Sequence, residues 1–283
     1  MVRKVCIINQ PEGLGDILYI QKIGHHFKSL GYEIFWPVCP AYCNIISEYL
    51  PDFNYYCNND ESVLELFNQE VLDVIKNHPG QKGKIFSGEV GDIDLKVIPT
   101  NHLNDNAEFQ KDSVPLLSLM SKKYAFVGLS DQDWPDYVNL KRNSKKENEL
   151  FYDVLGLKDE DNYAFVNSFL GTQPHHVSNW TFIVDEFKKS DSHKNGMSFV
   201  KLEFIEGFTV FDWLKVFERA KEIWMEGSSL TWLAEKVEMQ AEKFFLWSRN
   251  GPGDLNLFYK FTHDWKFHQD LTFQIPKLNS FEQ

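Results

Sequence analysis

The feature that most constrains the fold is a glycine-rich turn directly after the first apolar run. The run Val5-Cys-Ile-Ile8 is followed by Asn9-Gln-Pro-Glu-Gly13-Leu-Gly15-Asp16. A short β-branched run that ends in such a turn and opens a helix is typical of a doubly wound α/β domain, which binds ligands at the carboxyl ends of its strands. Leu18 stands where a dinucleotide-binding fingerprint has its third glycine. Asp16, at the start of the helix, therefore favours acid/base chemistry over the binding of a pyrophosphate.

The first half of the chain alternates short apolar runs with amphipathic stretches. These patterns predict strands at residues 4–9, 33–38, 53–57 and 95–98, and helices at 14–30, 41–50, 63–75 and 149–155. Between residue 98 and the apolar stretch 116–126 the pattern is weak. Gly31 and Gly156 stand where glycine commonly ends a helix. The stretch between residues 131 and 149 is polar and is expected to lie between the two lobes.

The same pattern restarts after residue 157 and predicts a second α/β unit. Strands are expected at 163–167, 199–204, 222–225 and 243–247, and helices at 179–188, 210–219 and 229–237. Strands that alternate with helices form parallel sheets. We therefore expect a domain at 1–157, a second at 158–255, and an aromatic-rich tail, 256–283, that crosses back onto the first. Two such Rossmann-like lobes would place the carboxyl ends of both sheets around one central cleft.

Length, charge and cysteine usage limit the function classes. The 283 residues fit two domains, and the net charge of −12 argues against a large surface for nucleic acid. The basic residues Lys141, Arg142, Lys145 and Lys146 are interpreted as solvated. The four cysteines lack metal-site spacing and are expected to be free thiols. No apolar run is long enough for a membrane span and the first residues are interpreted as a strand, so we expect a cytoplasmic location in a bacterium or a virus-infected cell.

A second candidate site follows the strand predicted at residues 222–225. It is Glu226-Gly227-Ser228-Ser229, at the start of a helix. Gly227 permits a tight turn, and hydroxyl groups beside open backbone N–H groups at a helix N-terminus suit a phosphate. The alternative is an ordinary helix cap, because serine is a favoured capping residue.

Other polar residues follow predicted strands in the second half. Glu206 is a candidate to accept hydrogen bonds from ribose hydroxyls, with a purely structural role as the alternative, and the turn with Ser168 and Thr172 is a candidate to touch a phosphate. Asp212 is interpreted as a charge in the first turn of a helix. The pair His175-His176 lacks the partners of a zinc site, and Asp131-Gln-Asp133 is interpreted as part of a loop. No metal site is predicted.

The two glycine turns together resemble the signature sites of GT-B glycosyltransferases, in particular the lipopolysaccharide heptosyltransferases and their relatives. In that family, an aspartate in the first turn acts as general base on the acceptor hydroxyl, and the matching position is Asp16. The family's second turn, Asp-Thr/Ser-Gly-x-x-His, holds the donor diphosphate, and this chain has Glu226-Gly-Ser-Ser-Leu-Thr-Trp there. The family's ribose-binding acid maps onto Glu206. Its phosphate-binding lysine has no match between Ser168 and Asn179.

The resemblance implies an inverting, metal-independent transferase that uses a nucleotide-sugar as co-substrate and needs no other cofactor. Asp16 is the expected base, Gly13, Gly15 and His102 belong to the acceptor side, and the second lobe holds the donor. The expected acceptor is a saccharide or another hydroxyl compound, including a hydroxylated base in phage DNA. Two alternatives stay open, namely a nucleotide-sugar epimerase and a non-catalytic module that binds a nucleotide or a glycan.

Overall fold

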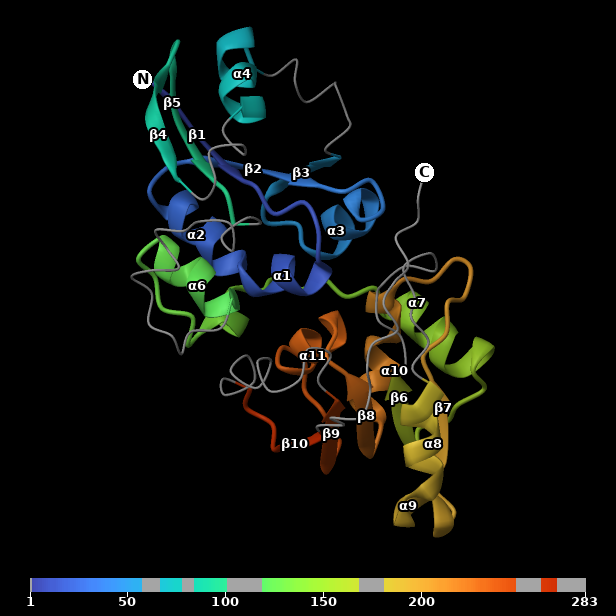
Figure 1. Ribbon diagram of the computed structural model, residues 1–283. Helices are drawn as coiled ribbons and strands as arrows, with labels where there is room; N and C mark the ends of the chain where they lie inside the picture. Colours follow the sequence, from blue (N-terminus) through green and yellow to red (C-terminus); the bar gives the residue numbers. More distant parts are fainter. Residues whose placement is uncertain are drawn as a thin grey trace, which may run out of the picture.

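The computed structural model describes residues 2–57, 67–77, 84–100, 119–167, 181–247 and 261–268. Within these residues the chain forms two lobes, each built on a five-stranded sheet (Figure 1). This is the α/β architecture of two Rossmann-like lobes that the sequence predicts. The sheet of the first lobe ends at Ile98 and that of the second begins at Tyr163.

The first sheet is parallel except for one edge strand. Its strand order is β3-β2-β1-β5-β4, with β1 at Arg3–Ile8, β2 at Glu33–Val38, β3 at Asn54–Cys57, β4 at Phe86–Val90 and β5 at Ile93–Ile98. Only β4 and β5 pair antiparallel. The strand order reverses at β1, which pairs with β2 on one side and β5 on the other. Ligands of open α/β sheets bind at such a reversal.

Helices cover both faces of the first sheet. Helix α4 (Gln69–Asn77) packs Val71 against Val5 and Ile7 on one face. Helices α1 (Leu14–Tyr19), α2 (Gln21–Ser29) and α3 (Cys43–Tyr49) cover the other face. The single helix predicted at 14–30 is thus divided at Ile20, where the Gln21 side-chain amide donates to the Ile17 carbonyl (2.9 Å) and occupies a backbone acceptor.

The second sheet is parallel throughout. Its strand order is β10-β9-β8-β6-β7, with β6 at Tyr163–Asn167, β7 at Ser198–Lys201, β8 at Glu222–Glu226, β9 at Lys243–Trp247 and β10 at Trp265–His268. Along the chain this is the flavodoxin-like order 2-1-3-4-5, which reverses between β6 and β8. The described residues of the tail, 261–268, extend the second sheet through β10, and the rest of the tail lies outside the described residues.

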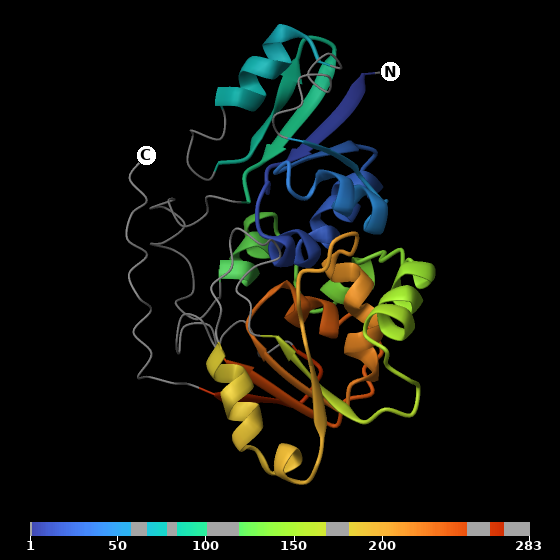
Figure 2. The same cartoon turned by 90° about the vertical axis from the view of Figure 1, so that its right-hand side faces the viewer.

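Helix α8 (Thr181–Lys189) lies on one face of the second sheet, and α10 (Leu214–Arg219) and α11 (Ser229–Ala234) lie on the other (Figure 2). The 3₁₀ turn η7 (Val210–Trp213) leads into α10, and the short α9 (Asp191–Lys194) follows α8. Helix α11 is shorter than predicted, since it ends at Ala234.

The segment between the sheets packs against both lobes. It contains α6 (Leu119–Phe126), the 3₁₀ turn η4 (Trp134–Tyr137), α7 (Ser144–Asn148) and a π-helical turn, η5 (Glu149–Val154). The polar stretch 131–149 therefore includes buried residues, among them Trp134. Trp134 contacts both Tyr19 of the first lobe and Trp232 of the second, with ring centroids 5.2 and 5.4 Å away, and the Tyr19 and Trp232 rings also meet directly, at 4.7 Å. One continuous hydrophobic cluster joins the inner faces of the two lobes.

The cysteines differ from the expectation of four free thiols. Cys43 of α3 and Cys57 of β3 form a disulfide, with Cα atoms 5.4 Å apart, while Cys6 and Cys39 are free. The pairing arises because the chain turns back after α3 and lays β3 beside β2. Spacing in the sequence does not reveal that return.

Candidate functional site

The two glycine turns lie at the carboxyl ends of β1 and β8, which are central strands of their sheets. Each turn leads into a short helix, and these helices, α1 and α11, face one another between the lobes (Figure 1). The fold therefore brings together two motifs that are more than two hundred residues apart in the sequence.

Positions 13 and 15 of the first turn each require glycine, for different physical reasons. Gly13 has a φ of 77°, and a Cβ atom there would lie 2.5 Å from Oδ2 of Asp16. At Gly15 a Cβ atom would lie 2.6 Å from Cδ1 of Trp232, a residue of α11. Gly13 thus makes room for the carboxylate, and Gly15 allows the two lobes to approach closely.

Asp16 forms an ion pair with a buried lysine. The Lys123 ammonium, on α6, donates to Oδ1 of Asp16 and to Oε1 of Gln10, the latter at 2.6 Å. The Lys123 side chain is 3% exposed, whereas that of Asp16 is 33% exposed. Burial lowers the pKa of Lys123, and the Asp16 carboxylate acts in the opposite direction. The pair is therefore open to solvent on its acidic side alone.

The second turn is more closed. Glu226 is fully buried. The backbone N–H of Gly227 donates to the carbonyl of Trp247 (3.0 Å), and that of Ser228 donates to Oγ1 of Thr231 (3.1 Å), as in a capping box. These two N–H groups already have acceptors in the protein, so the open donors predicted for this turn are not found at Gly227 and Ser228.

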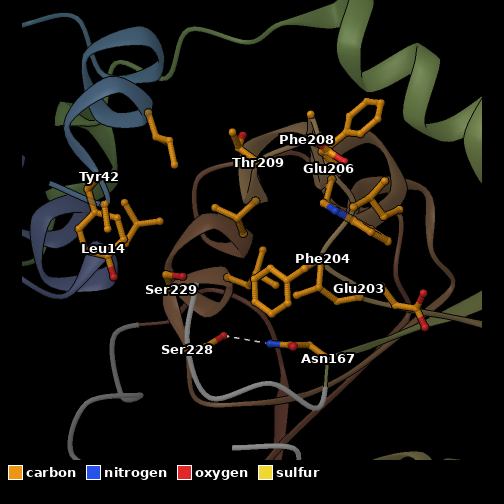
Figure 3. Close-up of a pocket in the computed structure, with 18 residues that line it drawn as sticks. Leu14, Tyr42, Asn167, Glu203, Phe204, Glu206, Phe208, Thr209, Ser228 and Ser229 are labelled. Atoms are coloured by element: carbon orange, nitrogen blue, oxygen red, sulfur yellow. Dashed lines mark hydrogen bonds between the residues drawn. The ribbon is translucent and has the colours of Figure 1, made fainter. Parts of the chain in front are cut away.

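Ser229 differs from its neighbours in the turn. The residue is 8% exposed, and its hydroxyl has no hydrogen-bond partner among the described residues. A buried hydroxyl without a partner is uncommon in folded proteins. Ser229 lines a cavity (Figure 3), so a bound molecule could supply the missing partner.

That cavity has a volume of about 580 Å³ and lies between the lobes. Its walls come from three places: the first lobe, the segment from Leu202 to Trp213, and the second turn. In Figure 3, Leu14 and Tyr42 of the first lobe stand opposite Phe204 and Glu203 of the second. At its floor the Asn167 side-chain amide donates to Oγ of Ser228 at 3.2 Å (Figure 3). The cavity therefore opens at the strand-order reversal between β6 and β8.

The lining is mostly aromatic and aliphatic, with acidic charge at its edge. Glu203 and Glu206 are exposed lining residues, and no lysine, arginine or histidine is among the described residues that line the cavity. Aromatic walls with a few carboxylate and hydroxyl acceptors suit a flat ring that carries hydroxyl groups.

The structure brings only some of the predicted site residues to this cavity. Glu206, Ser228 and Ser229 line it. Asp16, Gly13, Gly15, Glu226 and Gly227 are not part of its lining, although Leu14, two residues before Asp16, is. Ser168, Thr172 and His102 lie outside the described residues, as does His175-His176.

Sequence reasoning missed two groups near the turns, Lys123 and Asn167. A lysine on the inner side of an apolar helical stretch, Leu119–Phe126, was the available signal for Lys123. Asn167 is the last residue of β6, and the sequence drew attention only to Ser168 and Thr172 after it.

Asp212 has a structural role at the contact between the lobes. It accepts hydrogen bonds from the backbone N–H of Thr209 (2.7 Å) and from the Tyr49 hydroxyl of α3 (2.5 Å), and it is fully buried. The Tyr49 and Phe211 rings stack 4.6 Å apart. Asp212 is in the first turn of a helix, as predicted, and its carboxylate also accepts a hydrogen bond from Tyr49 of the first lobe.

The remaining charged motifs are engaged in the fold. Arg142 pairs with Glu147 and Glu218. Asp131 accepts from the Tyr19 hydroxyl (2.6 Å), and Asp133 pairs with Lys22. Across the described ranges, no three histidine, cysteine or carboxylate side chains are grouped as metal ligands. No helix in the described parts of the chain is long and apolar enough to cross a membrane.

Comparisons with known proteins identify the fold. No protein-family model matches the sequence, and no curated protein matches it. A solved structure of a glycosyl transferase family 9 protein from Veillonella parvula DSM 2008 superposes with a TM-score of 0.51 at 9% identity, over 94% of this chain and 87% of that one. E. coli ADP-heptose lps heptosyltransferase II superposes with a TM-score of 0.52 at 11% identity, over 95% and 91%. The chain thus shares the GT-B fold of these proteins.

Proposed function

We propose that this chain is a glycosyltransferase that moves a sugar from a nucleotide-sugar donor to an acceptor hydroxyl. The observation that carries the proposal is the position of Asp16. It is a partly exposed carboxylate on α1, the helix that faces the second lobe and contributes Leu14 to the cavity. The shared fold with two proteins named as glycosyltransferases supports the same activity.

In the proposed reaction the Asp16 carboxylate takes the proton of the acceptor hydroxyl as the oxygen attacks the anomeric carbon. The nucleoside diphosphate leaves from the opposite face of the sugar, which inverts the anomeric configuration. No metal is assigned to this step. Stabilisation of the leaving group is assigned to the second turn, where Ser229 offers a hydroxyl to the donor.

The cavity is assigned to the nucleoside part of the donor. Its aromatic and aliphatic walls suit a base, and Glu206 is an acceptor for ribose hydroxyls. For the acceptor we propose a saccharide or another hydroxyl compound. A DNA base is less favoured, because the Arg142 charge, which a basic groove would need, is paired with two glutamates.

The proposal is tested with a panel of nucleotide-sugars, with and without simple glycan acceptors, by measuring the release of nucleoside diphosphate. Asp16→Asn should lower turnover by about 10²- to 10⁴-fold while donor binding persists. Glu12→Gln is the matched control, because Glu12 is an exposed carboxylate of the same turn. Binding without turnover in the wild-type chain would favour the non-catalytic module, and full activity of Asp16→Asn would exclude Asp16 as the base.

A further inference from the structure

The ion pair between Asp16 and Lys123 leads to an inference that rests on the proposed function. We infer that Lys123 is a positioning residue for the base: its ammonium holds Oδ1 of Asp16 and leaves Oδ2 as the oxygen that accepts the proton of the acceptor hydroxyl.

Lys123 is held by two acceptors in a nearly closed site. Its ammonium donates to Oδ1 of Asp16 and to Oε1 of Gln10. Gln10 is itself buried, and its side-chain amide donates to the Glu12 carbonyl (2.7 Å), which directs Oε1 toward the ammonium. Lysine is rarely buried without such partners, because moving the ammonium out of water is costly. The first turn and α6 together therefore hold the Lys123 ammonium in one position.

The second carboxylate oxygen is placed by the glycine of the turn. Oδ2 of Asp16 lies where a Cβ atom of residue 13 would be only 2.5 Å away. Any residue other than glycine would push Oδ2 aside. Lys123 and Gly13 thus act on the two oxygens of one carboxylate and together set its direction.

The exposure of the pair distinguishes positioning from direct binding of substrate. The Asp16 side chain is one third exposed, but the Lys123 side chain is almost completely covered. A substrate can therefore reach the carboxylate without reaching the ammonium. This argues against Lys123 as a ligand for the donor phosphates, and for an effect that passes through Asp16.

The other charged groups nearby are engaged elsewhere. In the segment after α6, Asp131 is bonded to Tyr19 and Asp133 is paired with Lys22. Glu12, in the turn itself, is exposed. From α11 of the second lobe, the neutral Trp232 packs on Gly15. Among the described residues, Lys123 is therefore the cation that is paired with the Asp16 carboxylate, and a neutral side chain at position 123 removes this positive charge from beside the carboxylate.

The test compares Lys123→Met and Lys123→Gln with Lys122→Met, a control on the same helix. Turnover of a nucleotide-sugar found active with the wild-type chain is measured against pH. Both Lys123 variants should lose about 10- to 100-fold in kcat, because the carboxylate is no longer oriented. The acid limb of kcat/KM should move up by about one pH unit, while Lys122→Met keeps the wild-type profile. An unchanged acid limb in both Lys123 variants overturns the inference.

A double variant separates positioning from direct binding. If Lys123 acts only through Asp16, Lys123→Met should cause no further loss in the Asp16→Asn background. A further loss of turnover, or a raised KM in that background, overturns the inference because it means that the lysine contacts substrate.

A measurement without substrate distinguishes failure of the positioning inference from failure of the proposed transferase function. The Asp16 carboxyl carbon, followed by ¹³C NMR, should titrate at higher pH in Lys123→Gln than in the wild-type chain. Titration at the same pH in both proteins overturns the inference, even if the chain is an active transferase. If the signal moves up in Lys123→Gln but the wild-type chain turns over no nucleotide-sugar, the ion pair stands and Asp16 is not a base, so the proposed function and the positioning role are overturned together.

Discussion

The first and second turns have a similar construction and opposite environments. Each follows a central strand, contains an acid and glycine, and opens a six-residue helix. In the first turn the carboxylate of Asp16 is partly exposed and paired with Lys123. In the second turn Glu226 is fully buried, and the Ser228 backbone is used to cap the helix. An acid in a βα turn therefore does not define a chemical role by itself.

This difference in environment suits the two turns to different roles. An exposed carboxylate with a fixed direction can exchange a proton with a bound hydroxyl, and a buried one cannot do so without rearrangement. The second turn instead offers the hydroxyl of Ser229 to a cavity with aromatic walls. In the proposed reaction the first turn thus orients a carboxylate, and the second turn contributes to binding.

The largest effect is expected from Gly13→Ala. The positive φ of Gly13 and the contact with Oδ2 of Asp16 both disfavour a side chain, so turnover should fall by about 100-fold and stability by about 1–3 kcal/mol. Gly88→Ala, in β4 of the same lobe, is the control, since its Cβ atom would have ordinary contacts of 3.6 Å or more.

Gly227→Ala should cost less stability than Gly13→Ala, because Gly227 has no positive φ. Equal losses for the two turn glycines would contradict the comparison.

The next effect concerns the contact between the two helices. Gly15→Ala should lower the free energy of unfolding by about 1–3 kcal/mol, because its methyl group would overlap the Trp232 ring. In a Trp232→Ala background the same substitution should cost little, which a double-mutant cycle in urea would detect. Simple additivity of the two changes would show that the lobes do not meet at this point.

A third prediction concerns the hydrogen bond between Tyr49 and Asp212, which joins the lobes beside the cavity. Tyr49→Phe should lower the free energy of unfolding by about 1–2 kcal/mol at pH 8. Burial and the hydrogen bond to Asp212 raise the pKa of Tyr49. Because the pKa in the folded state is the higher one, the stabilisation is complete below the unfolded value of about 10 and is lost as the pH rises further. The difference between wild type and Tyr49→Phe should therefore shrink above about pH 10, as urea titrations at several pH values can show.

The smallest effect on stability is expected from Ser229→Ala. Removing a buried hydroxyl that lacks a partner should leave stability unchanged or raise it by up to about 1 kcal/mol. The donor should bind about tenfold more weakly, since one hydrogen bond to a phosphate oxygen or sugar would be lost. Calorimetry with the donor and thermal unfolding measure the two quantities. A marked loss of stability with unchanged donor affinity would make the second turn purely structural.

Much of the fold can be predicted from the sequence because local patterns specify it. The bounds of β2, β6 and β9 match their predictions, since each is an apolar run with at most one charged or amide residue at its end. Strand β4 was missed, although Gly91-Asp92 between two strands is a recognised hairpin signal. The disulfide between Cys43 and Cys57 was missed because it depends on how α3 is followed by β3.

The sequence by itself determined the two βα turns, the parallel sheets around them and the choice of Asp16 as the acid to examine. The tertiary structure decided what each acid faces. Lys123 reaches Asp16 across 107 positions, and Tyr49 reaches Asp212 across 163. The charge state and direction of a carboxylate depend on its solvation and its partners. Those partners come from distant segments that only packing brings together, so the pattern of the turn cannot contain them.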